Sequence, residues 1–123
     1  MRSLVIDDSR VARAVIGSIL RELNHDVVEA ANGREGLDRL AEFPDVELVL
    51  VDWNMPVMDG LEFIRAVRAQ AAYDPVRIVM VTTETECDQM NRAMAAGANE
   101  YVMKPFTKEV LVAKLSMLDV FGA

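Results

Sequence analysis

Short apolar runs alternate with longer amphipathic stretches along the whole sequence, and this alternation constrains the fold more than any other feature. The runs 48–51 and 78–81 are continuously apolar, as is typical of strands buried on both faces of a parallel sheet. In the stretch 9–24, apolar residues fall on every fourth position, which is close to the helical period. Strands are predicted over 4–6, 26–30, 48–51, 78–81 and 101–103, and a helix follows each of them, over 9–24, near 37–41, over 61–71, over 90–97 and from 107 onward.

Five strand–helix units in strict alternation predict an α/β fold of three layers, in which a parallel sheet lies between two layers of helices. A chain of 123 residues, of which 52% are hydrophobic, fits one domain over residues 1–123 and has enough apolar residues for a core. In sheets of this type, ligands bind outside the carboxyl ends of the strands. The residues at those ends are therefore the candidates for function.

Composition excludes several classes of function. The net charge of −7 argues against binding of nucleic acid or of an anionic membrane surface. No apolar run approaches the roughly 18 residues of a transmembrane helix, and the N-terminus reaches Asp7 too soon for a signal peptide. The single Cys87 cannot form an internal disulfide. We therefore expect a soluble cytoplasmic protein. His25 lies between the first predicted helix and the second strand, and we expect it in a turn on the surface.

Polar side chains follow four of the predicted strands. Asp7 and Asp8 follow the first strand, Asp52 the third, Thr82 the fourth and Lys104 the fifth. Carboxylates at close range repel one another, and a hard divalent cation such as Mg²⁺, which prefers oxygen ligands, relieves that repulsion. An ammonium and a hydroxyl beside the same site suit the oxygens of a phosphoryl group. If the sheet brings these strand ends together, the sequence predicts a site for Mg²⁺ and phosphoryl transfer.

Each of these features has a simpler explanation when it is taken alone. Two acids after a strand favour the dipole at a helix N-terminus. A threonine after a strand is usually a β-former, and a lysine before proline is usually a surface residue. All of them at the strand ends of one alternating chain make a much more specific signal.

The motifs at these strand ends resemble those of the receiver domains of two-component response regulators. The resemblance covers essentially the whole chain, and the run 52–56 together with Tyr101 is most similar to CheY-type chemotaxis regulators. It implies a flavodoxin-like (CheY-like) fold with strand order 2-1-3-4-5. The motifs that carry it are Val5-Ile6-Asp7-Asp8-Ser9, Val51-Asp52-Trp53-Asn54-Met55-Pro56, Met58-Asp59-Gly60, Val81-Thr82 and Tyr101-Val102-Met103-Lys104-Pro105-Phe106.

The resemblance implies a role for each acid of the site. Asp52 would be the nucleophile that becomes an aspartyl phosphate. Asp8, Asp52 and the backbone carbonyl of Asn54 would hold Mg²⁺ directly. Mn²⁺ is expected to be able to substitute for Mg²⁺ at this site. Asp7 would bind the same ion through water.

The resemblance also implies how phosphorylation is sensed. Lys104 would bind a phosphoryl oxygen, and Pro105 would follow a cis peptide bond. Thr82 would form a hydrogen bond with the phosphoryl group on activation. Tyr101 would then turn inward, which would change the face formed by the fourth helix, the fifth strand and the fifth helix.

Three positions are expected to adjust the chemistry. Asn54 and Glu84 occupy the variable positions that tune the phosphoryl lifetime in this family, and they match the CheY-type pair, which predicts a short lifetime. Thr83 departs from the family pattern, because many members have alanine or glycine there. A β-branched side chain at this position is expected either to narrow the access to the phosphorylation site or to alter the surface that a partner binds.

The predicted function is a signalling switch and not an enzyme with a separate substrate. A histidine kinase would phosphorylate it, and its target would be a flagellar motor switch or a chemotaxis complex. The expected state is a monomer, with dimerisation on activation left open. Two alternatives stay open: a phosphorelay intermediate that passes the group to a histidine phosphotransfer protein, and a receiver trimmed from a longer regulator.

Two other functions are disfavoured by single residues. A phosphatase of the haloacid-dehalogenase type would need a second aspartate two residues after the nucleophile, and this position holds Asn54, which cannot titrate. A pseudo-receiver that only binds partners would be expected to lose one of its acids or the lysine, and all of them are present.

Overall fold

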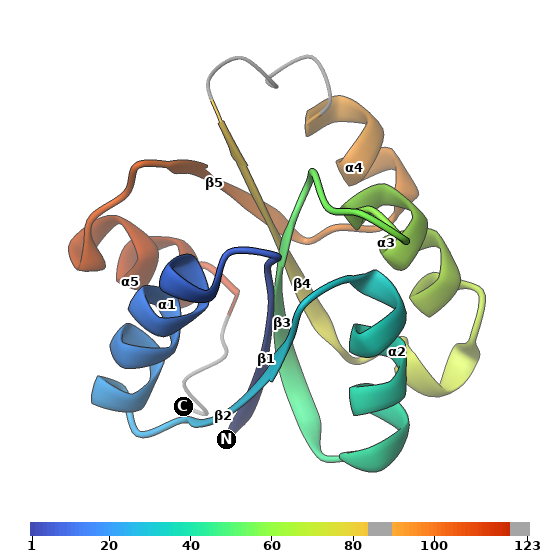
Figure 1. Cartoon of the computed structure of the whole chain (residues 1–123), viewed down its shortest axis with the longest axis horizontal. Helices are drawn as coiled ribbons and strands as arrows, with labels where there is room; N and C mark the ends of the chain where they lie inside the picture. The colour runs from blue at the N-terminus through green and yellow to red at the C-terminus, as the bar shows by residue number, and fades with distance from the viewer. Residues whose placement is uncertain (84–89, 119–123) are drawn as a thin grey trace.

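A computed structural model of the chain describes residues 1–83 and 90–118 (Figure 1). Five parallel strands form one sheet in the order β2-β1-β3-β4-β5, as predicted. The helices that connect successive strands cover both faces of the sheet. The central strands are continuously apolar because they are buried on both faces. The strands are β1 (Arg2–Ile6), β2 (Asp26–Ala30), β3 (Val46–Asp52), β4 (Arg77–Thr83) and β5 (Glu100–Lys104).

Helices cover both faces of the sheet, and the three-layer α/β architecture is confirmed. In Figure 1, α1 and α5 lie on one face, and α2, α3 and α4 lie on the other. A short 3₁₀ helix, η1, was not predicted from the sequence. The helices are α1 (Arg10–Glu22), α2 (Gly33–Glu42), α3 (Gly60–Arg68), η1 (Ala71–Tyr73), α4 (Met90–Ala96) and α5 (Lys108–Ser116). In residues 1–83 and 90–118, no helix combines the length and apolar character needed to span a membrane.

The sheet separates two apolar layers. In β4, Ile78 and Met80 pack into the layer beneath α2, α3 and α4, whereas Val79 and Val81 pack into the layer beneath α1 and α5. This alternation follows from the two-residue period of a strand. Each central strand therefore contributes to both cores and holds the two helical layers in register.

The helix α1 buries a different stripe from the one that the sequence pattern indicated. Val11 and Val15 are 74% and 54% exposed, and the buried positions of this helix include Ile16 and Leu20. The period of 3.6 residues makes every fourth position drift by about 40° around the helix. Consequently, in the series of apolar residues at every fourth position from Val11, only the later residues reach the sheet.

His25 is buried and not on the surface, so that prediction was wrong. Asn24 adopts a positive φ of 67°, which ends α1, and the His25 N–H donates to the carbonyl of Leu20 at 3.0 Å. The imidazole is then buried beside β1, where Nδ1 is 2.6 Å from Oγ of Ser3 and the two share a hydrogen bond. The burial results from how the turn folds back, which a hydropathy pattern does not show.

Arg68, near the end of α3, connects three other segments through its guanidinium group. Its nitrogens donate to the carbonyls of Tyr73 (3.0 Å), Val76 (2.7 Å) and Gly97 (3.0 Å), and to Oδ1 of Asn99 (2.9 Å). These partners lie around η1, before β4, and between α4 and β5. The arginine therefore fixes the C-terminal end of α4 against the rest of the molecule.

Candidate functional site

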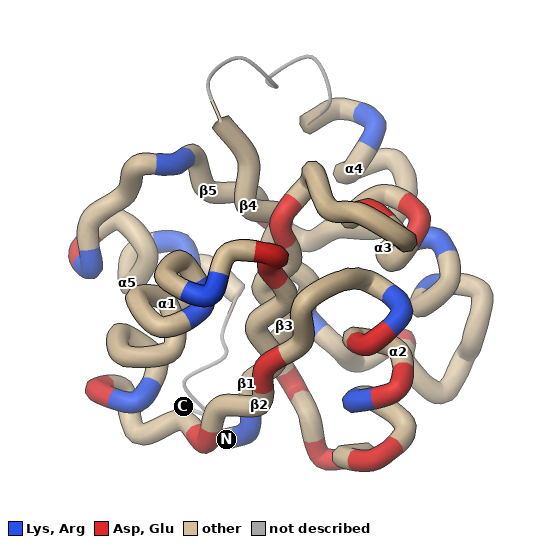
Figure 2. The backbone as a smooth tube through the Cα atoms, in the orientation of Figure 1, with Lys and Arg blue, Asp and Glu red and all other residues tan. Residues whose placement is uncertain are grey.

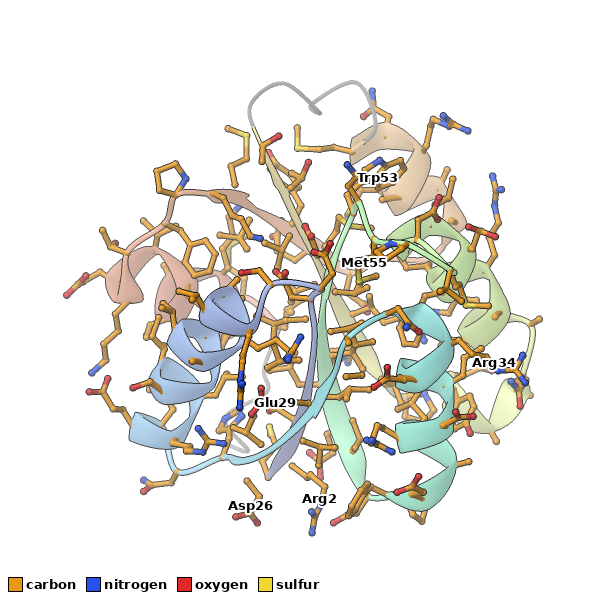
Figure 3. All side chains as sticks on the ribbon, in the orientation of Figure 1. Arg2, Asp26, Glu29, Arg34, Trp53 and Met55 are labelled. Atoms are coloured by element: carbon orange, nitrogen blue, oxygen red, sulfur yellow. The ribbon has the colours of Figure 1, made fainter. Side chains whose placement is uncertain are left out.

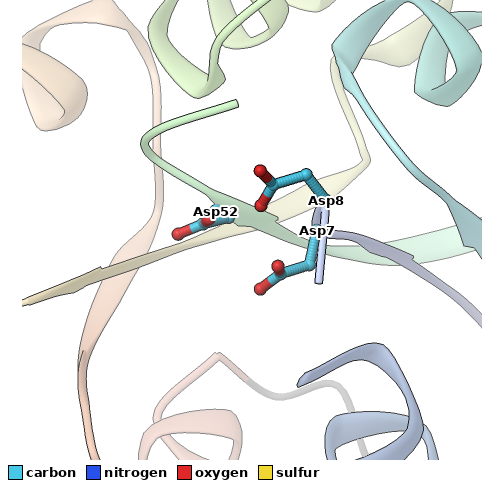
Figure 4. A group of neighbouring side chains, drawn as sticks. All are labelled: Asp7, Asp8 and Asp52. Carbon is cyan, nitrogen blue, oxygen red and sulfur yellow. The ribbon is translucent and has the colours of Figure 1, made fainter. Parts of the chain in front are cut away.

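Three carboxylates meet at the carboxyl ends of β1 and β3. Asp7 and Asp8 directly follow β1, and Asp52 is the last residue of β3. The two strands are neighbours in the sheet, so one carboxylate oxygen from each of the three residues lies within 4.8 Å of the others. Figure 4 shows the three side chains extending to the same side of these strand ends. In Figure 2, red segments of the backbone lie close together where the chain enters α1 and where β3 ends.

Asp7 is held in one orientation by contacts at every polar group. It is 1% exposed, and its Oδ1 accepts the N–H of Ser9 at 2.8 Å. Its Oδ2 accepts Nζ of Lys104 at 2.8 Å. Its own N–H donates to the carbonyl of Ala30 at 3.1 Å, and its carbonyl accepts Nη1 of Arg13 at 2.6 Å. These contacts position the acidic pair at the end of β1.

Lys104, the last residue of β5, brings a positive charge to the acids. Its Nζ lies 2.8 Å from Oδ2 of Asp7 and 3.7 Å from Oδ1 of Asp52. Burial lowers the pKa of Lys104, but the hydrogen bond to Asp7 and the negative charges around it raise the pKa above its ordinary value. Lys104 is therefore an ammonium at neutral pH. The peptide bond between Lys104 and Pro105 is cis.

Thr82 lies within β4 and not after it, because the strand continues to Thr83. Thr82 is buried, and its hydroxyl donates to the carbonyl of Thr83 at 3.4 Å. The preceding residue, Val81, pairs with Asp52, which places Thr82 one position beyond the acid on the neighbouring strand. The structure thus brings Asp7, Asp8, Asp52, Thr82 and Lys104 to one edge of the sheet.

Asn54 is exposed in the loop between β3 and α3, two residues after Asp52. Trp53 and Met55 on either side of it are buried and lie beside the end of β3 (Figure 3). The N–H of Gly60 donates to the carbonyl of Trp53 at 3.0 Å. A Cβ at Gly60 would lie 2.5 Å from the carbonyl oxygen of Asp52, so only glycine allows α3 to start this close to the site.

The same loop contains a strained turn at Val57. This residue has a φ of 70° although it is β-branched, and its side chain is 81% exposed. The N–H of Met58 donates to the carbonyl of Pro56 at 2.8 Å, which makes a three-residue γ-turn centred on Val57. The carbonyl of Met58 in turn accepts the N–H of Gly33 at 3.0 Å, so the loop is bound to the start of α2.

Two further residues were predicted to belong to the switch or to tune it, Tyr101 and Glu84. Tyr101 lies away from the acids, and Glu84 lies outside the described part of the chain. Tyr101 is partly buried in β5 and pairs with Met80, two positions before the pair Thr82–Met103. Its ring lies under the ammonium of Lys114, with Nζ 4.4 Å from the ring centroid. Glu84 falls in residues 84–89, which the structure does not describe.

An apolar hollow of about 500 Å³ opens beside Lys104. Thr83, which departs from the family pattern, is one of its lining residues. The other lining residues come from α1 and from the segment after β5: Ala12, Val15, Ile16, Pro105 and Phe106.

The donor set suits a hard divalent cation. Three carboxylates that share one edge provide oxygen ligands and an excess of negative charge, which is the chemistry that Mg²⁺ prefers.

Sequence reasoning missed two residues that hold this group of carboxylates in place. Ser9 was named only as part of the motif 5–9, but its N–H binds Asp7 and its Oγ caps α1 by accepting the N–H of Ala12. No pattern marked Arg13 as a donor to the Asp7 carbonyl.

Comparison with known proteins defines the class. The family model described as the response regulator receiver domain matches residues 3–116. The chain therefore belongs to the response-regulator receiver family, whose members are signalling switches.

Relatives and solved structures place it more closely. A chemotaxis protein CheY homolog from Campylobacter jejuni is 46% identical over 123 residues, covering 99% of this chain and 93% of the relative. The chemotaxis protein CheY1 of Helicobacter pylori is 39% identical over 119 residues, or 96% of each chain. The solved structure of Vibrio cholerae CheY4 superimposes with a TM-score of 0.86 at 36% identity, covering 94% of this chain and 96% of CheY4. The chain is a receiver domain of the CheY type, and its fold is the CheY-like flavodoxin fold.

Proposed function

We propose that Asp52 accepts a phosphoryl group from a histidine kinase with the help of Mg²⁺, and that a protein partner recognises the resulting change. The observation that carries this proposal is the grouping of the Asp52 carboxylate with two further acids and with the Lys104 ammonium 3.7 Å away. Phosphoryl transfer depends mainly on positioning and on neutralising charge, and this grouping provides both.

Asp8, Asp52 and the carbonyl of Asn54 would hold the ion, with Asp7 binding it through water. The ion would supply positive charge for the phosphoryl oxygens as they approach the acids. A carboxylate is ordinarily ionised at neutral pH, so the attack needs no general base. One oxygen of Asp52 forms a bond to phosphorus while the bond between phosphorus and the donor breaks, and the donor leaves with that electron pair.

Lys104 and Thr82 would then bind the new group. The ammonium of Lys104 is already close to Asp52 and bears three donors, so it is able to bind a phosphoryl oxygen. The Thr82 hydroxyl, one position further along the next strand, would donate to another. Tyr101 would turn inward in response and change the surface formed by α4, β5 and α5. The phosphoryl group adds about 1.5 to 2 negative charges, which is enough to drive such a rearrangement.

The setting that we propose is bacterial chemotaxis in the cytoplasm, with residues 1–123 acting as one receiver domain. The names of the relatives support it, since those from two organisms and the Vibrio cholerae structure are chemotaxis proteins. The target would be a flagellar motor switch or a chemotaxis complex. The only reactions that the domain catalyses would be its own phosphorylation and dephosphorylation, at a rate tuned by Asn54 and Glu84.

The test is intact mass after incubation with acetyl phosphate and Mg²⁺. We expect a gain of about 80 Da, the mass of one phosphoryl group, that needs Mg²⁺ and is lost in Asp52→Asn. Asp45→Asn is the matched control, because Asp45 is exposed and pairs with Arg2 at 3.0 Å, away from the acids. An adduct that persists in Asp52→Asn would refute the assignment of the acceptor. Failure of the wild type to form either the adduct or a beryllium fluoride complex would refute the proposed function.

A further inference from the structure

Lys114 of α5 holds two adjacent residues of β5 at once. Its Nζ lies 4.4 Å from the centroid of the Tyr101 ring and 3.4 Å from Oε1 of Glu100. The same oxygen of Glu100 accepts the backbone N–H of Tyr101 at 2.9 Å. One carboxylate oxygen therefore joins the strand backbone to the ammonium that covers the ring.

The contacts of Lys114 are partly buried from water, which strengthens the attraction between its ammonium and the Tyr101 ring. The side chains of Lys114 and Glu100 are 27% and 13% exposed. A cation over an aromatic face is attracted more strongly as the surrounding water is removed. The Tyr101 ring is itself partly buried against the layer beneath α2, α3 and α4. A ring that turned away from this position would lose its contact with the ammonium.

We propose that Lys114 is a positioning residue that holds Tyr101 in its unphosphorylated position and so sets the threshold of the switch. This inference rests on the proposed function, since it assumes that Tyr101 moves when Asp52 is phosphorylated. A contact made in only one of two states biases the equilibrium towards that state by its own free energy. Lys114 and Glu100 thus oppose activation, and phosphorylation has to overcome their contacts.

The direct test is to measure the affinity for beryllium fluoride in the presence of Mg²⁺. Binding is monitored by the fluorescence of the buried Trp53, which is next to Asp52. Lys114→Met keeps most of the side chain and removes the ammonium. We expect the apparent affinity to rise about two- to fivefold, because less free energy is needed to move Tyr101. Lys114→Arg should restore the wild-type affinity.

Lys108→Met is the matched control, because it removes a lysine from the same helix. Lys108 pairs with Glu22 of α1 at 3.0 Å and not with the strand. We expect its affinity to equal that of the wild type. An equal rise in both variants would mean that net charge, and not the contact with Tyr101, is responsible, and it would overturn the inference.

A double-mutant cycle separates this role from a general effect on the fold. In a Tyr101→Leu background the ring is absent, so Lys114→Met should change the affinity by less than in the wild type. Fluorotyrosine labelling gives an independent signal, because the sequence has only two tyrosines, Tyr73 and Tyr101. In the free protein, Lys114→Met should move the Tyr101 resonance towards its position in the beryllium fluoride complex and leave Tyr73 unchanged.

The outcomes distinguish the inference from the function on which it rests. An unchanged or weaker affinity in Lys114→Met, with a wild type that binds beryllium fluoride normally, would overturn the role of Lys114 and leave the switch intact. An effect of the same size with and without the Tyr101 ring would also overturn it. A wild type that neither binds beryllium fluoride nor gains a phosphoryl group would overturn the proposed function, and the inference with it.

Discussion

Nζ of Lys104 lies 2.8 Å from Oδ2 of Asp7, and this contact joins residues that are 97 positions apart in the sequence. The lysine is closer to Asp7 than to Asp52, for which the distance is 3.7 Å. Asp7 is almost fully buried, and an uncompensated buried carboxylate is costly. In this arrangement Lys104 therefore contributes to stability as well as to the chemistry that we propose for it.

We expect Lys104→Met to lower the free energy of unfolding by about 1 to 3 kcal/mol without Mg²⁺, because Asp7 loses a charged partner. The loss should be smaller with saturating Mg²⁺, since the cation would compensate the same acids. Urea unfolding with and without Mg²⁺ measures both values. A loss that is equal in the two conditions would show that the ion does not act on these acids.

Mg²⁺ itself should stabilise the wild type. A ligand that binds only the folded state stabilises it by about 2.7 kcal/mol at one hundred times its dissociation constant. Asp8→Asn removes one carboxylate from the group and should abolish most of this gain, while reducing the repulsion in the metal-free protein. Thermal unfolding across a Mg²⁺ titration is the measurement. An undiminished gain in Asp8→Asn would place the ion elsewhere.

Relief of the strained turn should stabilise the protein. Val57→Asn replaces a β-branched residue at positive φ by one that tolerates this conformation, and we expect a gain of about 1 kcal/mol in unfolding free energy. Val11→Asn is the control, because Val11 is similarly exposed but lies in α1. No gain is expected there. Equal effects in both variants would mean that exposure, and not backbone strain, is responsible.

Arg68→Met should be strongly destabilising, by about 2 to 4 kcal/mol, because several carbonyls and the side chain of Asn99 lose their donor. Arg65→Met, at an exposed position of the same helix, should change the stability by less than about 0.5 kcal/mol. Guanidinium unfolding compares the two. Similar values would contradict the role that the hydrogen bonds give to Arg68.

The stability should decrease in mild acid because of His25. Burial lowers the pKa of His25, the N-terminal ammonium lowers it further, and Glu47 opposes both. The unfolded chain therefore takes up the proton first, so stability falls as the pH drops below about 6.5 towards the lower pKa of the folded state. His25→Gln should flatten this part of the stability curve. An unchanged slope in that variant would assign the pH dependence to other groups.

Much of this fold is predictable from the sequence because a parallel sheet imposes a simple pattern on it. The run 48–51 is apolar without interruption since helices cover both faces of β3, and the polar residues after the strands necessarily meet at one edge. Alternation and strand ends therefore predicted that Asp7, Asp52 and Lys104 lie at the same edge of the sheet, whereas the strand order that makes them neighbours was implied by the family resemblance.

What the sequence did not reveal depends on geometry that no local pattern records. The exposure of Val11 and Val15 depends on how α1 is rotated against the sheet. The burial of His25 depends on one residue at positive φ. Most of the partners of Arg68 are backbone carbonyls, and every residue has one, so nothing in the sequence marks those that it binds.

The separation of the core into two apolar layers has a consequence for how the chain tolerates change. A cavity or a larger side chain beneath α1 and α5 has no direct contact with the layer beneath α2, α3 and α4, because the sheet lies between them. Substitutions in the two layers should therefore have nearly additive effects on stability. Each face of the molecule is free to diverge in sequence with little regard for the other, while the strands that carry the acids stay the same.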